Sequence, residues 1–204
     1  MLFEDTYKMI YSATTAEFKD KGSKFIAYSF PVHNEEEIKQ HLLDLRKIHY
    51  DARHHAYAYI LGFDKLNWRA NDDGEPSGSS GKPIYGQLLS FDLTNTLIVV
   101  VRYFGGTKLG IPGLINAYRS AAREALNAAE ITEHRIEEVY EIAFSYADMN
   151  VVMRILKEAQ LEPITTDFQI DCKLKFKVRK LDSSRIYEQF AAVHTLKIKY
   201  IETI

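Results

Sequence analysis

The sequence lacks the features that identify secreted, membrane and disulfide-stabilised proteins. It has 204 residues and one cysteine, Cys172, which excludes an internal disulfide and a metal cluster built from cysteine alone. No apolar run approaches the roughly 20 residues that span a bilayer, so no membrane partner is expected. The N-terminal stretch MLFEDTYKMI has no basic segment followed by an apolar core, which argues against a secretory signal. We therefore expect a soluble, cytoplasmic protein.

The chain also lacks an excess of positive charge. Its formal net charge is −2, with 26 Lys and Arg against 28 Asp and Glu. From residue 134 onward the two kinds balance at 11 each, so neither part of the chain is a basic tail. A strongly basic chain would point directly to nucleic acid. Any nucleic-acid binding must therefore come from a local patch.

Motifs of the common phosphate-binding and hydrolytic sites are absent as well. The chain contains neither GxxxxGK[ST] nor GxGxxG. Around Ser77, Ser79 and Ser80 there is no GxSxG elbow. These serines are better suited to donate hydrogen bonds to an anion or to their own loop than to act as nucleophiles; the alternative is a flexible polar loop.

The chain is organised around residues 96–110, TLIVVVRYFGGTKLG. The apolar run, rich in β-branched residues, predicts a strand covered on both faces. Arg102 ends this run, Gly105 and Gly106 let a partner approach the main chain, and Lys108 adds a charge before a long helix. Glycines and cations before a helix start are typical of an anion cradle. The alternative is a tight turn with solvated cations.

Hydrophobic periodicity predicts the elements of the first part of the chain. We expect a hairpin from residues 11–18 and 23–32, a helix capped by Asn34 and a strand at 56–62. Residues 67–83, NWRANDDGEPSGSSGKP, have no periodicity and are expected to be one long loop, functional or disordered. A short helix from Pro83 to about Ser90, the central strand and a helix over about 113–129 complete this part.

The pattern changes near residues 131–135, which predicts domains at 1–132 and 135–204. In the second we expect a strand at 138–146, a helix to about 159, strands at 163–170 and 171–180, a helix at 182–193 and a strand at 195–202. This βαββαβ order is the ferredoxin-like unit. The predicted fold class is therefore α+β, with two α/β sandwich domains.

A basic sheet face is predicted in the second domain. Alternation along two strands places six cations on one face: Lys173, Lys175, Lys177, Arg179, Lys197 and Lys199. In a ferredoxin-like sheet these strands flank the first, and a basic face of this kind binds RNA in other such domains. Glu141 on the same face weakens the patch. The alternative is ordinary lysine decoration that deters aggregation.

A metal site is the weakest of the candidate sites. His54 and His55, together with nearby carboxylates, could be imagined around one ion. Adjacent histidines on a strand point to opposite faces, so both cannot easily face one metal. The carboxylates are better explained as groups that orient the loop through turn hydrogen bonds. We predict no metal and no cofactor.

Two long segments resemble the YigZ/IMPACT family. They are DDGEPSGSSGKPI, from Asp72 to Ile84, and VVVRYFGGTKLGIPGLINAYRSAA, from Val99 to Ala122. The chain departs from the pattern at Ser79-Ser80, where relatives commonly have Thr-Ala. The resemblance covers essentially the whole chain, with an IMPACT-type N-terminal domain followed by the ferredoxin-like domain of bacterial members.

The resemblance implies a fold and a role near translation. The first domain is expected to resemble the second domain of a small-subunit ribosomal protein, and the second the last domain of elongation factor G. Eukaryotic relatives regulate translation under amino-acid stress by competing for the activator of an initiation-factor kinase. Bacteria lack that pathway, so this partner is not carried over. Some relatives have been labelled proline dipeptidases, but no metal-ligand set or nucleophile motif here supports that activity, and no catalytic residue is transferred.

Three hypotheses follow. The first is a translation-linked regulatory protein that binds RNA or a ribosome-associated ribonucleoprotein through the RYFGGTKLG and DDGEPSGSSG loops. The second is a protein-interaction module without nucleic acid. The third is an enzyme acting on a small phosphorylated compound, with an acidic residue of the loop as acid or base. The candidate binding residues for an anion or nucleic acid are Asp72, Asp73, Glu75, Ser77, Ser79, Arg102, Gly105, Gly106, Lys108 and Gly110.

Overall fold

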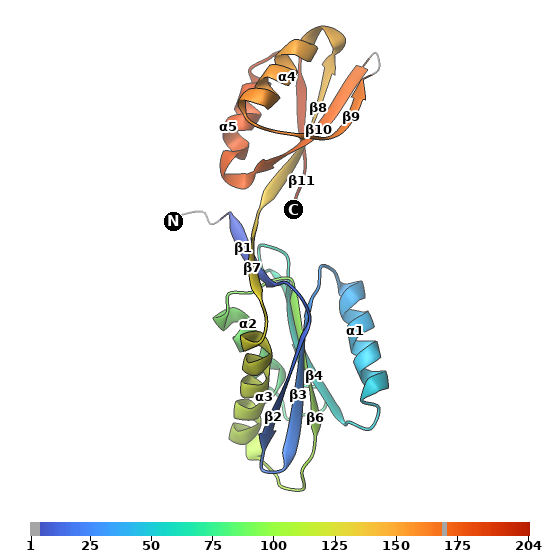
Figure 1. Cartoon of the computed structure of the whole chain (residues 1–204), viewed down its shortest axis with the longest axis vertical. Helices are drawn as coiled ribbons and strands as arrows, with labels where there is room; N and C mark the ends of the chain where they lie inside the picture. Colours follow the sequence, from blue (N-terminus) through green and yellow to red (C-terminus); the bar gives the residue numbers. More distant parts are fainter. Residues whose placement is uncertain (1–4, 169–170) are drawn as a thin grey trace. The chain divides into compact units, whose positions relative to one another are not determined.

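The computed structural model describes residues 5–168 and 171–204 and has a mixed α+β architecture (Figure 1). The chain forms two compact units, one of Tyr7–His134 and one that joins Met1–Thr6 to Arg135–Ile204. Residues 5 and 6, which the expected domain 1–132 included, thus group with the C-terminal unit. The expected strand 163–170 ends in two residues that lie outside the described ranges, as do residues 1–4.

The first unit is built on a five-stranded antiparallel sheet in the order β2-β3-β6-β4-β5. Its strands are β2 (Thr14–Asp20), β3 (Ser23–Pro31), β4 (His54–Leu61), β5 (Asn67–Asn71) and β6 (Thr96–Tyr103). Helix α1 (Glu35–Ile48) covers one face, and helices α2 (Gly81–Ser90) and α3 (Gly110–Asn127) cover the other (Figure 1). β1 (Thr6–Ile10) and β7 (Ile131–Arg135) form a separate two-stranded sheet.

β6 is the central strand because both of its faces are covered by helices. Its five residues 97–101 have no exposed surface. Ile98 and Val100 pack into the core under α2 and α3, whereas Leu97 and Val99 pack into the core under α1. The apolar run thus forms the two-sided buried strand that the sequence predicts.

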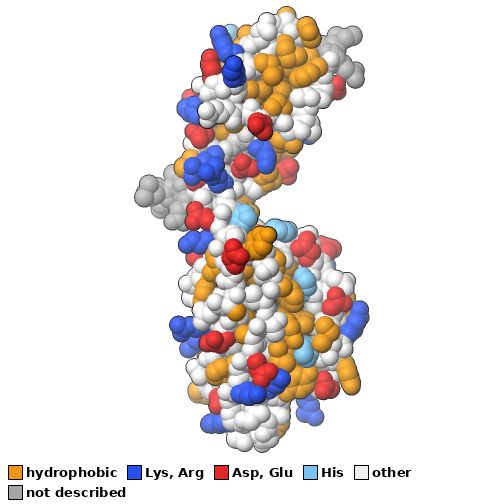
Figure 2. All heavy atoms as spheres, in the orientation of Figure 1, with side chains coloured by type: hydrophobic (Ala, Val, Ile, Leu, Met, Phe, Trp, Pro, Cys, Tyr) orange, Lys and Arg blue, Asp and Glu red, His pale blue; other side chains and the backbone are white. Residues whose placement is uncertain are grey.

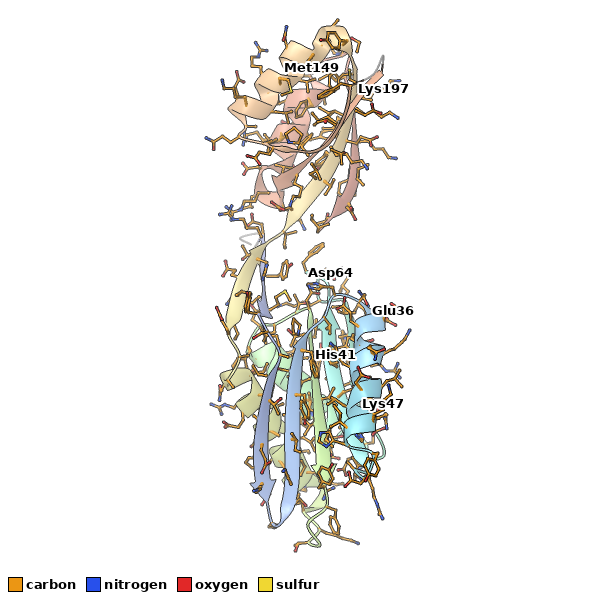
Figure 3. All side chains as sticks on the ribbon, turned by 45° about the vertical axis from the view of Figure 1, so that its right-hand side comes forward. Glu36, His41, Lys47, Asp64, Met149 and Lys197 are labelled. Carbon is orange, nitrogen blue, oxygen red and sulfur yellow. The ribbon has the colours of Figure 1, made fainter. Side chains whose placement is uncertain are left out.

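Helix α1 begins with a reciprocal capping arrangement. The Asn34 side chain accepts a hydrogen bond from the Glu37 amide at 2.9 Å, and the Glu37 carboxylate accepts one from the His33 amide at 2.8 Å. Figure 3 shows Glu36 in the first turn and Lys47 in the last turn. This charge distribution favours the helix because it opposes the helix dipole. The Asn34 cap is therefore confirmed.

Aromatic and histidine side chains of α1 and the sheet contact one another, and Figure 2 shows hydrophobic and histidine side chains close together on this unit. His41, which Figure 3 labels on α1, stacks on Phe30 of β3 with ring centroids 4.0 Å apart. Tyr28 stacks on Phe30 and donates toward a second histidine, His49, at 2.7 Å. These contacts fix the position of α1 on its face of the sheet.

The second unit has the ferredoxin-like order. β8 (Glu137–Ser145) leads through a short 3-10 turn (Tyr146–Asp148) to α4 (Met149–Glu158), and then follow β9 (Pro163–Phe168), β10 (Asp171–Arg179), α5 (Lys180–Ala191) and β11 (Lys197–Thr203). The antiparallel sheet has the order β11-β8-β10-β9, and both helices share one core with its buried face. The predicted βαββαβ order is confirmed. No helix within the described residues is long and apolar enough to cross a membrane.

Two parts of the fold differ from the sequence prediction. Residues 67–71, which were placed in a long loop, form the edge strand β5, and Trp68 stacks on Tyr85 of α2 at 4.4 Å. The boundary stretch 131–135 is itself strand β7, paired with β1. Both strands are short and largely polar, so no local apolar pattern marks them. β5 pairs with the preceding strand β4, whereas β7 pairs with the distant β1.

The loop after β6 lies against the turn between β2 and β3, at the same end of the sheet (Figure 1). A Cβ atom at Gly105 would lie 1.9 Å from the carbonyl carbon of Gly22. Gly22 has φ +82°, a conformation that favours glycine. Gly105 is therefore required for close backbone packing beneath the loop.

Replacing Gly105 by alanine should destabilise the protein, because the backbone of the β2–β3 turn must move. We expect Gly105→Ala to lower the free energy of unfolding by about 2 kcal/mol or more. The control is Gly86→Ala in α2, where an added Cβ meets no atom within 4 Å, and it should raise stability by up to about 1 kcal/mol. Urea denaturation compares the two; equal effects would contradict the packing argument.

Candidate functional site

The candidate site begins where β6 ends and its last side chains leave the core. Arg102 lies opposite Phe25 of β3 and His54 of β4 in the sheet. It is only 8% exposed although it carries a charge. A buried arginine needs a partner, because an uncompensated charge in the interior is costly.

That partner is Glu75, from the loop of residues 72–80 that we call the acidic loop. Arg102 Nη1 donates to Glu75 Oε1 at 2.8 Å, and the Tyr118 hydroxyl of α3 donates to the same oxygen at 2.7 Å. Burial raises the pKa of Tyr118 and the Glu75 charge raises it further, so the phenol remains a neutral donor. The ion pair thus joins the acidic loop, β6 and α3.

Aromatic rings enclose the Arg102 guanidinium. Its central carbon lies 5.6 Å from the ring centroid of Phe25 and 5.6 Å from that of Phe104. Such cation–π contacts strengthen when the cation is desolvated. The buried Nε has no hydrogen-bond partner within the part of the chain that the structure describes. Arg102 therefore retains donor capacity beyond its bond to Glu75.

Asp72 holds the acidic loop in shape. Its carboxylate accepts hydrogen bonds from the amides of Gly78, Ser80 and Gly81 and from the Ser80 hydroxyl, at 2.8 to 3.0 Å. Burial raises the pKa of Asp72, but these hydrogen bonds outweigh that effect and leave it below its ordinary value. Asp72 thus occupies the start of α2, where an external anion would otherwise be favoured.

Asp73 connects the acidic loop to α1 and β4. Its carboxylate accepts from Arg46 at 2.7 Å and from the His55 amide at 2.7 Å, and its carbonyl accepts from His54 Nδ1 at 2.9 Å. Ser79 donates to the Pro76 carbonyl at 2.7 Å. These side chains therefore stabilise the loop itself, as the hydrogen-bonding interpretation of the loop suggests.

The loop of residues 104–109, which we call the glycine loop, leads into an uncapped helix. Leu109 occupies the N-cap position of α3 and no side chain caps it. The first amides of a helix have no partner within the helix. In α3 these are the amides of Gly110, Ile111 and Gly113, because Pro112 has no N–H. Lys108, exposed and next to this helix start, adds positive charge.

The acidic loop and the glycine loop border one pocket of about 590 Å³. Residues that are themselves buried, such as Glu75 and Arg102, form its floor, while exposed residues form its rim. The lining residues are Asp51, Ala52, Arg53, His54, Glu75, Pro76, Arg102, Tyr103, Phe104, Lys108, Leu109, Gly110, Ile111 and Leu114. Positive charge predominates, because three Arg and Lys side chains face two carboxylates.

Only part of the predicted binding set lines this pocket: Glu75, Arg102, Lys108 and Gly110 do, whereas Asp72, Asp73, Ser77, Ser79, Gly105 and Gly106 do not. The sequence prediction missed Arg53 and Phe104. Phe104 lies within the RYFGGTKLG segment, and Arg53 directly precedes β4, whose start pairs with the end of β6. Knowledge of the antiparallel β4–β6 pairing would have placed Arg53 at this end of the sheet.

A chain of hydrogen bonds supports one wall of the pocket. Tyr103 donates to Asp51 at 3.0 Å and accepts from His49 Nδ1 at 2.8 Å, which leaves His49 Nε2 to accept from Tyr28. Burial lowers the pKa of His49 more than Asp51 raises it, in agreement with a neutral imidazole. The wall is thus fixed by contacts that extend to α1.

The two adjacent histidines have different surroundings. His54 lines the pocket, whereas His55 is 3% exposed, and both ring nitrogens of His55 lack partners among the residues described. Burial lowers the pKa of His55, so its ring is neutral. Within residues 5–168 and 171–204, no group of three or more His, Cys, Asp and Glu side chains is placed to hold a metal ion.

The predicted basic face of the second unit carries both signs of charge. β8 lies between β10 and β11, as expected, and brings acidic side chains between the cations. Lys175 pairs with Glu141 at 3.8 Å and Lys177 with Glu137 at 3.0 Å. Arg179 forms an ion pair with Asp5. The remaining cations of the set, Lys173, Lys197 and Lys199, are exposed.

Comparison with known proteins identifies the class to which this fold and pocket belong. The sequence profile of the Impact N-terminal domain matches residues 21–126, which include both loops of the pocket. A solved structure described as a hypothetical protein matches 98% of this chain and 99% of its own, with a TM-score of 0.73 and 26% identity. The two-unit α+β fold is therefore shared with that protein over the whole chain.

Curated relatives agree with the domain match. The chain is 34% identical to the IMPACT family member YvyE of Bacillus subtilis over 155 residues, 76% of this chain and 71% of the relative. It is 32% identical to the IMPACT family member YigZ of Escherichia coli over 151 residues, 73% of this chain and 74% of the relative. The chain belongs to the IMPACT family.

Replacing Asp72 should destabilise the first unit in a pH-dependent way. We expect Asp72→Asn to lower the free energy of unfolding by about 2 to 3 kcal/mol at pH 7, because hydrogen bonds to a carboxylate are lost. The folded-state pKa is depressed, so this stabilisation is present above the unfolded-state pKa and is lost as pH falls through the folded value. Denaturation at pH 7 and pH 3 should show the difference from wild type shrinking on acidification. A difference independent of pH would contradict it.

The buried ion pair should be sensitive to the loss of one partner. We expect Arg102→Ala to cost about 3 to 5 kcal/mol, because it leaves Glu75 buried and unpaired. Lys108→Ala, at an exposed position of the same pocket, should change stability by no more than about 0.5 kcal/mol. The double variant Arg102→Met/Glu75→Gln should cost less than the sum of its single changes in chemical denaturation. Additive losses would show that the two side chains are not coupled.

Proposed function

We propose that this protein binds RNA or a ribonucleoprotein in a translation-linked role, through the pocket between the acidic loop and the glycine loop. The observation that carries the proposal is that both family segments meet at this pocket, with Arg53, Lys108 and the uncapped α3 beside the exposed Phe104. Backbone phosphates are held by cations and helix amides. Unpaired bases stack on aromatic side chains, and Phe104 supplies one.

The proposal places the main contacts in the first unit. The sheet face of the second unit supplies at most weak electrostatic support, because Glu137 and Glu141 offset its cations. The role near translation is the one that the family resemblance implies. RNA is favoured over a purely apolar partner because the rim of the pocket is cationic.

The decisive experiment measures binding of the full chain to single-stranded RNA across a salt series. We expect Lys108→Ala and Arg53→Ala each to weaken binding about 3- to 10-fold at low salt and to reduce the log–log salt slope by about one unit. The matched control is Lys39→Ala, since Lys39 is an exposed lysine on α1 outside the pocket. The double variant Lys173→Ala/Lys197→Ala tests the sheet face of the second unit, and it should weaken RNA binding less than Lys108→Ala or Arg53→Ala does.

Two results would overturn this proposal. One is absence of RNA binding at low salt. The other is binding that Lys39→Ala weakens as much as Lys108→Ala, because the contact would then be diffuse. Arg102→Ala is unsuitable here, since its cost in stability would mask an effect on binding.

A second candidate function is supported by the size of the pocket. A volume of about 590 Å³ falls within the range of sites for small molecules, roughly 300 to 1,000 Å³. A small phosphorylated compound would use the same cations and helix start. Of the acidic residues of the loop that could act as acid or base, Asp72, Asp73 and Glu75, only Glu75 lines the pocket. Saturable binding of small phosphate esters without any binding of RNA would favour this candidate.

A further inference from the structure

The floor of the pocket combines a buried acceptor and a buried donor with unused hydrogen-bonding capacity. Both protein donors to Glu75 use Oε1, and Oε2 has no partner among the described residues although the side chain is only 3% exposed. Arg102 uses one of its five N–H donors for Glu75. Both side chains line the pocket.

This arrangement disfavours an anion at the floor. The charge of Arg102 is already balanced by Glu75, and a phosphate placed there would meet the carboxylate oxygen that lacks a partner. An uncharged group with a donor and an acceptor side by side suits the floor better, because it satisfies both residues at once. The edge of a nucleobase has this pattern.

The rim has the opposite preference. Arg53 and Lys108 are exposed cations, and the first amides of α3 have no capping side chain. A helix start beside cations favours phosphate. Phe104 is 59% exposed and lines the pocket, with the central guanidinium carbon of Arg102 5.6 Å from its ring centroid. It offers a surface for stacking.

We infer that the pocket holds one unstacked nucleotide, with the edge of its base on Glu75 and Arg102, the base against Phe104, and its phosphate at Lys108 and the start of α3. This inference rests on the proposed function and deepens it, because it makes the pocket a reader of a single base within single-stranded RNA. Uncharged recognition at the floor supplies selectivity, and charged recognition at the rim supplies affinity.

The test separates the two halves of the ligand. The four nucleosides, their 5′-monophosphates and inorganic phosphate are each titrated into the full chain and followed by NMR chemical shifts. At least one monophosphate should bind about tenfold more tightly than inorganic phosphate, a factor equivalent to ~1.4 kcal/mol. The same monophosphate should compete with single-stranded RNA.

Two variants should act on opposite halves. Glu75→Gln replaces the free acceptor by a donor, so it should weaken the nucleoside and the monophosphate about tenfold and leave inorganic phosphate unchanged or tighter. Lys108→Ala should weaken the monophosphate and inorganic phosphate and leave the nucleoside unchanged. Two results for Glu75→Gln would overturn the inference. One is an equal loss of affinity for the nucleoside, the monophosphate and inorganic phosphate, and the other is no loss of affinity for the nucleoside.

A control separates binding from stability. Ile98→Val trims a buried side chain of β6 that does not line the pocket, so it should lower the melting temperature while affinities stay within about twofold. A loss of nucleotide binding in Ile98→Val as large as that in Glu75→Gln would also overturn the inference. RNA binding that no mononucleotide competes with would overturn the single-nucleotide site and leave the proposed function intact. Nucleotide binding without RNA binding would support the pocket assignment and overturn the RNA function.

Discussion

The ion pair between Arg102 and Glu75 is the interaction on which the pocket of the first unit depends. It joins the end of the central strand β6 to the acidic loop, which has little apolar surface of its own. A buried pair of this kind is weak support for stability, because desolvation offsets much of its attraction. Its value lies in position, since the two charges can compensate each other only when loop, strand and α3 are all in place.

Around this pair, the acidic loop acts as a folded element without regular secondary structure. Asp72 replaces the external anion at the start of α2, and Asp73 connects the loop to α1 and β4. The two helix starts therefore differ: the start of α2 is occupied by the protein's own carboxylate, whereas that of α3 has no side-chain cap. Only the start of α3 lines the pocket.

Much of the fold could be predicted from the sequence because the signals are local. The apolar run of β6, the alternation of β8 and β10 and the Asn34 cap depend on residues near one another, and the structure has them. β5 and β7 could not be predicted because they are short and largely polar, and β1 could not because its partner β7 lies far along the chain. The same holds for the site: Glu75 and Arg102 were both selected, but Arg53 reaches the pocket only through β4–β6 pairing.

The N-terminal segment adds a consequence for the order of folding. Asp5 pairs with Arg179 across 174 positions of sequence, and β1 pairs with β7 across most of the first unit. Contacts of such long range close large loops of the chain, which costs conformational entropy. They therefore form late, after local structure has already ordered most of the residues between them. During synthesis β1 must therefore wait until β7, residues 131–135, has been made. For that interval, β1 has exposed backbone groups without its strand partner, which leaves it open to pairing with another chain.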